Sequence, residues 1–168
     1  MSVSLYDITV PVFIRALNNL SEILKKGEAF ADEKGLKHKE LLEARLYEDM
    51  GPLTSQIQRL SDTAKFVAVR VGQIDNVPME DNEVSFADLH ARIEKTIGVL
   101  KSVSPEQMAG REDAEVILKV GGNEVPFTGT SYILGFAIPN FYFHVTTAYD
   151  ILRHKGVPVG KRDYLGRA

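Results

Sequence analysis

The sequence predicts an all-α fold, a four-helix bundle with a small β-hairpin inserted between the third and fourth long helices. Three observations lead to it. Four segments repeat apolar residues at steps of three and four, as one-sided helices do. None of these apolar stripes can be buried alone, so the four are expected to pack around one axis. Alternating apolar residues around a glycine pair separate the last two long helices.

The first helix is expected to begin near Asp7 or Thr9, either of which can cap it. It should run to Lys34, because Gly35 favours a helix end. A short helix is predicted over 39–46. The apolar stripe of the first helix consists of Val10, Phe13, Ile14, Leu17, Leu20 and Leu24.

The second long helix is predicted to open at Pro52 and to end at Gly72. The third opens at Ser85, with Asp88 placed three residues later in a capping arrangement. Both have one-sided apolar faces. Those faces are Leu53, Ile57, Leu60, Ala64, Val67 and Val71 in the second, and Phe86, Leu89, Ile93, Ile97 and Leu100 in the third.

A hairpin is predicted from strands over 114–120 and 124–127 around Gly121, Gly122 and Asn123, and it should lie against the helices. The last helix should run from near Thr130 to Gly156, and a basic tail over 157–168 should wrap the surface. The predicted stripe of the last helix is Leu134, Ile138, Phe141, Val145, Ala148 and Leu152.

Length and composition exclude several classes of function. The 168 residues form one predicted domain, 1–168, with 44% hydrophobic residues. The absence of cysteine excludes disulfides, thiol nucleophiles and cysteine-ligated metals. A net charge of −3 gives no pull toward nucleic acid or membranes, and we expect neither partner. No apolar run is long enough for a membrane span and the N-terminus is unlike a signal peptide, so a cytoplasmic protein is expected.

The best candidate site surrounds Pro139, inside the last helix. A proline there removes a backbone hydrogen bond and crowds the carbonyl of Gly135, so a kink is expected. Asn140 and His144 follow at positions i and i+4, on one helix face at the edge of the core. His144 is the candidate catalytic residue, since imidazole suits proton transfer near neutral pH. The alternative is structural, with both side chains only satisfying hydrogen bonds in the core.

The second helix offers partners for this site. Gln56 and Arg59 are candidate pocket residues, and Asp62 could bind a metal or orient an imidazole. The alternative for Asp62 and Arg59 is an exposed ion pair. Tyr149 of the last helix is a further candidate for lining a pocket.

The other three histidines have simpler interpretations. His38 falls in a charged loop and is expected to be solvated. His90 borders an apolar stripe, as a hydrogen-bonded boundary residue does. His154 stands in the last turn of its helix, where a cation favours the helix dipole. Walker A, Rossmann, His-Glu-x-x-His and Gly-x-Ser-x-Gly motifs are all absent from the sequence.

Several motifs resemble those of a known family. They are Ser4-Leu5-Tyr6-Asp7 with Val10-Pro11, Leu41-Leu42-Glu43-Ala44-Arg45-Leu46, Asp49-Met50 with Pro52-Leu53, Asn140-Phe141-Tyr142-Phe143-His144, Gly156-Val157-Pro158, and Gly160-Lys161-Arg162-Asp163-Tyr164-Leu165-Gly166. Together they resemble a domain-of-unknown-function branch of the DinB/YfiT-like putative metalloenzyme superfamily, found in bacteria and fungi.

The resemblance implies a helical bundle, often dimeric, whose active members hold a divalent metal through three histidines. One of these lies on the second helix and two form His-x-x-x-His on the fourth. Here Asn140 precedes His144 in that motif, and the second helix has no histidine, so Asp62 or Gln56 would have to substitute. Two of the three expected ligands are therefore missing.

Three functions remain open. The first is a small-molecule site near His144 in the core. The second is a homodimeric binding or scaffolding module without catalysis. The third, which rests on the resemblance, is a transferase or isomerase that depends on a divalent metal.

Overall fold

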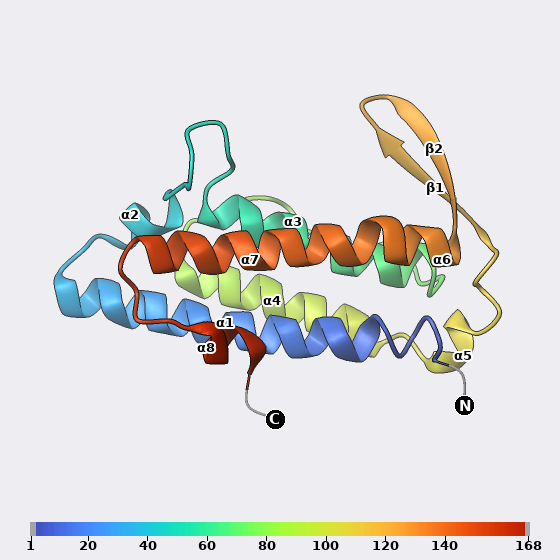
Figure 1. The fold of residues 1–168 in the computed structure, drawn as a ribbon, viewed down its shortest axis with the longest axis horizontal. Helices are drawn as coiled ribbons and strands as arrows, with labels where there is room; N and C mark the ends of the chain where they lie inside the picture. The colour runs from blue at the N-terminus through green and yellow to red at the C-terminus, as the bar shows by residue number, and fades with distance from the viewer. Residues whose placement is uncertain (1–2, 167–168) are drawn as a thin grey trace.

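The computed structural model describes residues 3–166 and shows a mostly helical chain with one two-stranded antiparallel hairpin (Figure 1). The predicted surface tail extends to Ala168, and its last two residues lie outside this range. In chain order the elements are α1 (Val10–Lys34), α2 (His38–Leu42), α3 (Leu53–Arg70), α4 (Phe86–Lys101), α5 (Pro105–Met108), β1 (Glu115–Val120), β2 (Asn123–Thr128), α6 (Gly129–Tyr132), the π-helical turn η1 (Ile133–Ala137), α7 (Ile138–His154) and α8 (Lys161–Leu165).

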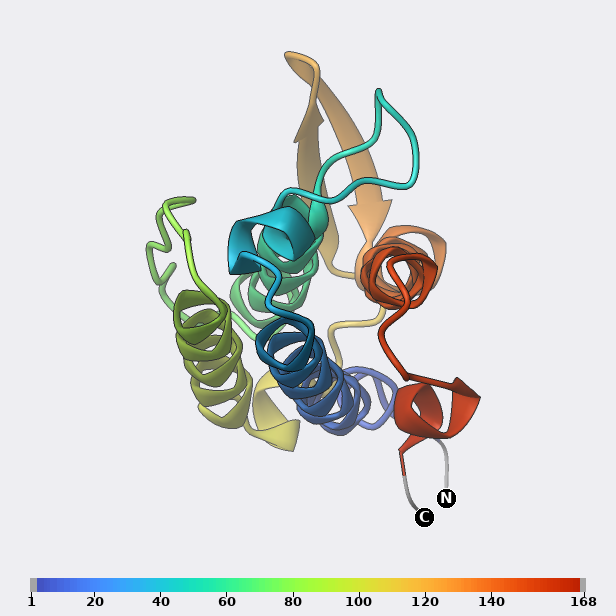
Figure 2. The ribbon, with the colours of Figure 1, turned by 90° about the vertical axis from the view of Figure 1, so that its left-hand side faces the viewer.

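The four long helices, α1, α3, α4 and α7, lie side by side and share one apolar core (Figure 2). Helix α3 contacts both α7 and α4, and α1 contacts α4 and α7. Phe13 of α1 stacks on Phe141 of α7 with ring centroids 4.2 Å apart. Burial of these apolar faces is the main force that holds the helices together. In residues 3–166, no helix is both long and apolar enough to cross a bilayer.

Local signals set the helix ends largely as predicted. Helix α1 ends at Lys34, and Gly35 adopts a left-handed conformation (φ 66°) that a glycine accepts without strain. At the start of α4 the Ser85 hydroxyl accepts from the backbone N–H of Asp88, while the Asp88 carboxylate accepts from the backbone N–H of Val84. The predicted helix 39–46 is shorter, because it begins at His38 and ends at Leu42.

The hairpin leaves the end of the helical body and projects away from it (Figure 1). Its turn is Gly121-Gly122, both with positive φ, and Val120 pairs with Asn123 across it. The expected packing against the helices holds at the base, where Val116 and Leu118 are buried. The outer part of the hairpin is exposed, including Val120.

The apolar stripe predicted for the last helix is wrong at its start. Leu134 is 55% exposed, whereas Ile133 and Ala137 are fully buried. The cause is the π-helical turn, in which the backbone N–H of Ile138 donates to the carbonyl of Ile133, five residues earlier. This wider turn precedes Pro139, which cannot donate a hydrogen bond, and it shifts the buried face by one residue.

A C-terminal strap, α8, lies across α1. The Arg15 guanidinium donates to the carbonyl of Leu165 (3.0 Å), and the Asn19 amide donates to the carbonyl of Tyr164 (3.1 Å). Lys26 forms an ion pair with Asp163 at 2.7 Å. The strap thus joins segments about 140 residues apart in sequence through polar contacts.

Candidate functional site

Polar side chains meet along the contact between α3 and α7, which run antiparallel. The His144 Nδ1 atom lies 2.7 Å from Oε1 of Gln56, and the Asn140 amide donates to the Thr63 hydroxyl at 2.8 Å. These contacts place both α7 candidates against α3, as expected for side chains four residues apart on one helix face. His144 is 6% exposed and Asn140 is half-buried.

These two hydrogen-bonded pairs form a row along α3, and a third pair that the sequence does not predict extends it. The Arg70 guanidinium donates to the hydroxyl of Tyr132, which is fully buried, at 2.9 Å. Burial raises the pKa of Tyr132, and the positive charge of Arg70 opposes this only in part. The α3 members, Gln56, Thr63 and Arg70, are spaced by seven residues. Polar residues that recur every seven positions beside the apolar stripe are the sequence signal for this row.

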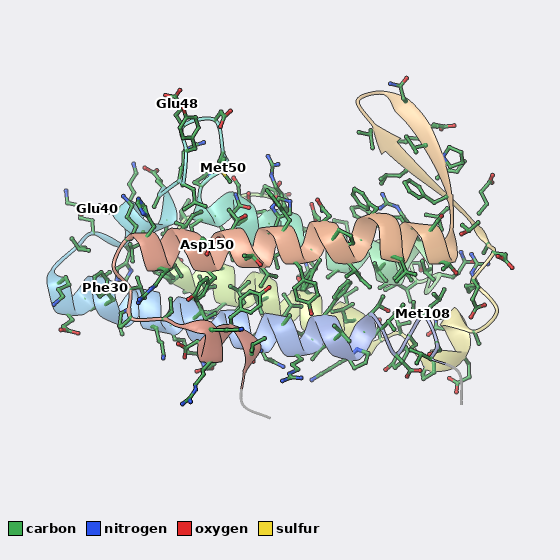
Figure 3. The ribbon with its side chains drawn as sticks, viewed as in Figure 1. Phe30, Glu40, Glu48, Met50, Met108 and Asp150 are labelled. Atoms are coloured by element: carbon green, nitrogen blue, oxygen red, sulfur yellow. The ribbon has the colours of Figure 1, made fainter. Side chains whose placement is uncertain are left out.

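The Gln56 amide fixes which nitrogen of His144 carries the proton. Gln56 Nε2 donates to the carbonyl of Gly51 at 2.8 Å, and a carbonyl can only accept. Gln56 Oε1 therefore faces the imidazole as an acceptor, so His144 Nδ1 must donate. Gly51 lies near the end of the loop 43–52, which projects from the helices and carries Glu48 and Met50 (Figure 3).

The second ring nitrogen, His144 Nε2, keeps its lone pair free. It makes no hydrogen bond with the residues described, yet it is not among their buried unpartnered atoms, so it has a small opening to solvent. Burial, and then the positive charge of Arg59, lower the pKa of His144 from 6.5 to about 4. At neutral pH the imidazole is thus uncharged, with Nε2 as an acceptor.

Arg59 of α3 and Phe143 of α7 both lie near His144. Arg59 is exposed on α3 and forms no ion pair or hydrogen bond through its side chain among residues 3–166. Phe143 is 57% exposed, and its ring meets that of His144 edge-on with centroids 5.2 Å apart. Three surface hollows, around α4, α2 and α8, are lined by other residues.

Asp62 does not belong to this site. Its carboxylate contacts Lys65 at 3.0 Å and Arg92 of α4 at 3.3 Å, on the side of α3 away from α7. The prediction that it orients the His144 imidazole is therefore wrong, because Gln56 holds that position. The alternative of an ion pair with Arg59 is also wrong, since Lys65 and Arg92 are its partners.

Tyr149 is likewise separate from His144. Its ring lies 5.9 Å from that of Tyr164 in the segment around α8, and it lines a hollow with Thr146 and Asp150. Asp150 is labelled on α7 in Figure 3. Five residues along a helix turn a side chain to the other flank, which explains the separation.

The remaining histidines are explained by their neighbours. His38 begins α2 instead of lying in a loop, and its Nε2 contacts Asp32 at 2.8 Å. His90 Nδ1 contacts the Ser21 hydroxyl at 2.9 Å, whereas its Nε2 is buried and has no partner among residues 3–166. His154 is exposed in the last turn of α7.

The donor set does not fit the three-histidine metal site that the family resemblance implies. His144 Nδ1 is occupied by Gln56, and the Asn140 nitrogen is occupied by Thr63. Across the described chain, no three His, Cys, Asp or Glu side chains are placed so that they could hold a metal ion together. One imidazole nitrogen and an amide oxygen are too few ligands for a stable zinc or similar site.

Comparison with known proteins agrees with the fold and the motifs. The family model DUF1993, a domain of unknown function, matches residues 5–165. The chain belongs to this family. A DinB family member protein from Shewanella denitrificans, whose crystal structure is known, is 40% identical, with a TM-score of 0.87. The match covers 98% of this chain and 93% of that one. No curated protein matches the chain. This DUF1993 chain is therefore a DinB-like domain of unknown function.

Proposed function

We propose that this DUF1993 protein, as a four-helix bundle, binds a small molecule at the surface of α3 and α7, with His144 Nε2 as its polar contact. The observation that carries the proposal is the chain of hydrogen bonds from His144 Nδ1 through Gln56 to the carbonyl of Gly51. A histidine held this way presents one fixed acceptor, as histidines in binding sites commonly do.

The chemistry of the ligand follows from the groups around the opening. Since Nε2 is neutral and unprotonated, the ligand must offer it an O–H or N–H donor. The exposed guanidinium of Arg59 favours an anionic group, such as a carboxylate or phosphate, on the same ligand. With a pKa of about 4, His144 is a weak base at neutral pH, which favours binding over proton transfer.

Nitrogen-detected NMR of the histidine side chains tests this proposal. Glycolate, which carries both a hydroxyl and a carboxylate, should shift the His144 Nε2 resonance in a saturable way. Acetate and ethylene glycol, which each lack one group, should bind more weakly. Arg59→Gln should abolish the difference in affinity between glycolate and ethylene glycol. Arg153→Gln removes an exposed charge from α7 and is the matched control, which should keep that difference. The absence of a saturable shift with all three probes would contradict the proposal.

A homodimeric binding or scaffolding module is the second candidate. The observation that favours it is the exposure of three apolar side chains on the hairpin, Ile117 on one face and Val120 and Val125 on the other, at 41%, 53% and 38%. Exposed apolar groups on a projecting element are typical of contact surfaces between proteins. Sedimentation velocity over a wide concentration range tests this candidate, and a strict monomer would contradict it.

A further inference from the structure

The two edges of the hairpin differ in their capacity to accept another strand. In a hairpin with a two-residue turn, the two residues that flank the turn form a hydrogen-bonded pair. From there, hydrogen-bonded and non-hydrogen-bonded pairs alternate along the strands. Val120 and Asn123 are that first pair, and Leu118 with Val125 and Val116 with Phe127 are the next bonded ones. Residues 115, 117 and 119 therefore turn their backbone N–H and C=O groups outward, along the free edge of β1.

The edge of β2 is partly closed. Pro126, which pairs with Ile117, has no N–H to offer at the outward position. The N–H of Thr128 already donates to the Ser131 hydroxyl at 2.9 Å. The outward groups of β1 make no backbone hydrogen bonds with any other described segment. Such an open edge favours pairing with another strand.

On β1, the side chains of the face opposite to buried Val116 and Leu118 form a self-complementary pattern. Glu115, Ile117 and Lys119 alternate along one face, and all three are exposed. Antiparallel pairing of two copies about Ile117 places Glu115 of each opposite Lys119 of the other. Opposite charges directly across two strands are stabilising. Shifting the register by two residues would place a charged residue opposite Ile117 instead. Lys119 contacts Glu124 within the hairpin at 3.4 Å, but both side chains are highly exposed, so that contact is weak.

We propose that two copies of this chain pair through the free edges of β1 and form one continuous four-stranded antiparallel sheet. This inference rests on the second candidate function, the homodimer, and names its interface. The hairpin projects beyond the helices, so a second hairpin can lie alongside it (Figures 1 and 2). Antiparallel pairing brings the exposed tip residue Val120 of each copy to the base of the other hairpin. Contact through strands of six residues is small, so we expect a dimer that dissociates at about micromolar concentrations.

Proline substitutions at matched positions test the interface by sedimentation velocity. Ile117→Pro removes an outward N–H of β1 without removing a hydrogen bond of the hairpin, and it should raise the dimer dissociation constant at least about tenfold. Glu124→Pro makes the equivalent change at the β2 edge and should leave the dimer intact. Circular dichroism checks that both variants keep the helical content of the original chain.

Charge reversal gives a second readout that does not depend on proline. Glu115→Lys and Lys119→Glu should each weaken self-association, because like charges then face each other. An equimolar mixture of the two variants should restore a dimer made of one copy of each. A chain that stays monomeric at all concentrations overturns both the interface and the homodimer candidate. A dimer that is insensitive to Ile117→Pro and to charge reversal overturns the interface alone.

Discussion

The Arg92 guanidinium lies 2.8 Å from the Glu83 carboxylate, and both side chains are almost fully buried, at 2% and 7% exposure. Arg92 also donates to the carbonyl of Glu80 and contacts Asp81. Burial raises the pKa of Glu83, but hydrogen bonds from Arg92 and Gln58 outweigh it and hold the pKa below its ordinary value. Arg92 thus holds the loop between α3 and α4 against both helices.

Arg92→Met should lower the free energy of unfolding by about 3–5 kcal/mol, because it leaves the buried Glu83 carboxylate without its charge partner. Urea unfolding measures this loss. Lys95→Met is the matched control, since exposed Lys95 donates a single hydrogen bond within residues 3–166, to the carbonyl of Pro78. It should cost about 1 kcal/mol or less. Equal losses in the two variants would show that the buried ion pair has no special role.

Acid should destabilise the folded chain through His144. Its pKa is about 4 when folded and near its ordinary 6.5 when unfolded, so only the unfolded chain takes up this proton between those values. Stability should fall as the pH decreases from 6.5 to 4, by up to about 3 kcal/mol, and this contribution should level off below pH 4. Urea unfolding across this pH range measures the effect. His144→Gln should lose the decrease in stability that comes from His144, whereas His154→Gln, at an exposed histidine, should keep it. Parallel pH profiles for all three proteins would contradict the low pKa.

Gln56 and His144 should be energetically coupled. Gln56→Leu leaves His144 Nδ1 and the carbonyl of Gly51 without their partner, and should cost about 1–3 kcal/mol. In a double-mutant cycle with His144→Phe, the combined loss should be smaller than the sum of the single losses by at least about 0.5 kcal/mol. Additive losses would indicate that the 2.7 Å contact contributes nothing to stability.

Two glycines should respond to alanine in opposite directions. A Cβ atom at Gly98, inside α4, would meet nothing within 4 Å, so Gly98→Ala should stabilise the chain by about 0.5–1 kcal/mol through helix propensity. At Gly129 the Cβ would overlap the carbonyl oxygen of Arg111, and Gly129→Ala should destabilise by at least about 1–3 kcal/mol. Thermal unfolding measures both changes. A lower melting temperature for Gly98→Ala would contradict the first expectation.

The helices, their ends and the hairpin follow from local sequence signals, because apolar spacing, caps and glycines act within a few residues. The register of the last helix does not follow, since the π-helical turn before Pro139 has no apolar signature of its own. A regular helix of 3.6 residues per turn therefore predicts that Leu134 is buried, whereas the structure buries Ile133.

The candidate site was predictable only in part. The spacing of Asn140 and His144 alone predicts that they share a helix face, and Pro139 directly precedes that face. Spacing does not decide which neighbouring helix faces each flank of α3, so it does not predict that Asp62 contacts Lys65 and Arg92 of α4 and not His144 of α7. The role of Gln56 depends on the loop carbonyl of Gly51, a contact that no residue pattern encodes.

The strap α8 has a consequence for how the chain matures during synthesis. Arg15, Asn19 and Lys26 of α1 leave the ribosome early, but their partners at residues 163–165 emerge only after every other described element. This flank of α1 must stay hydrated throughout translation, and its polar residues suit that interval. Docking of the strap is therefore expected to be the closing event of folding, after the helices have already assembled.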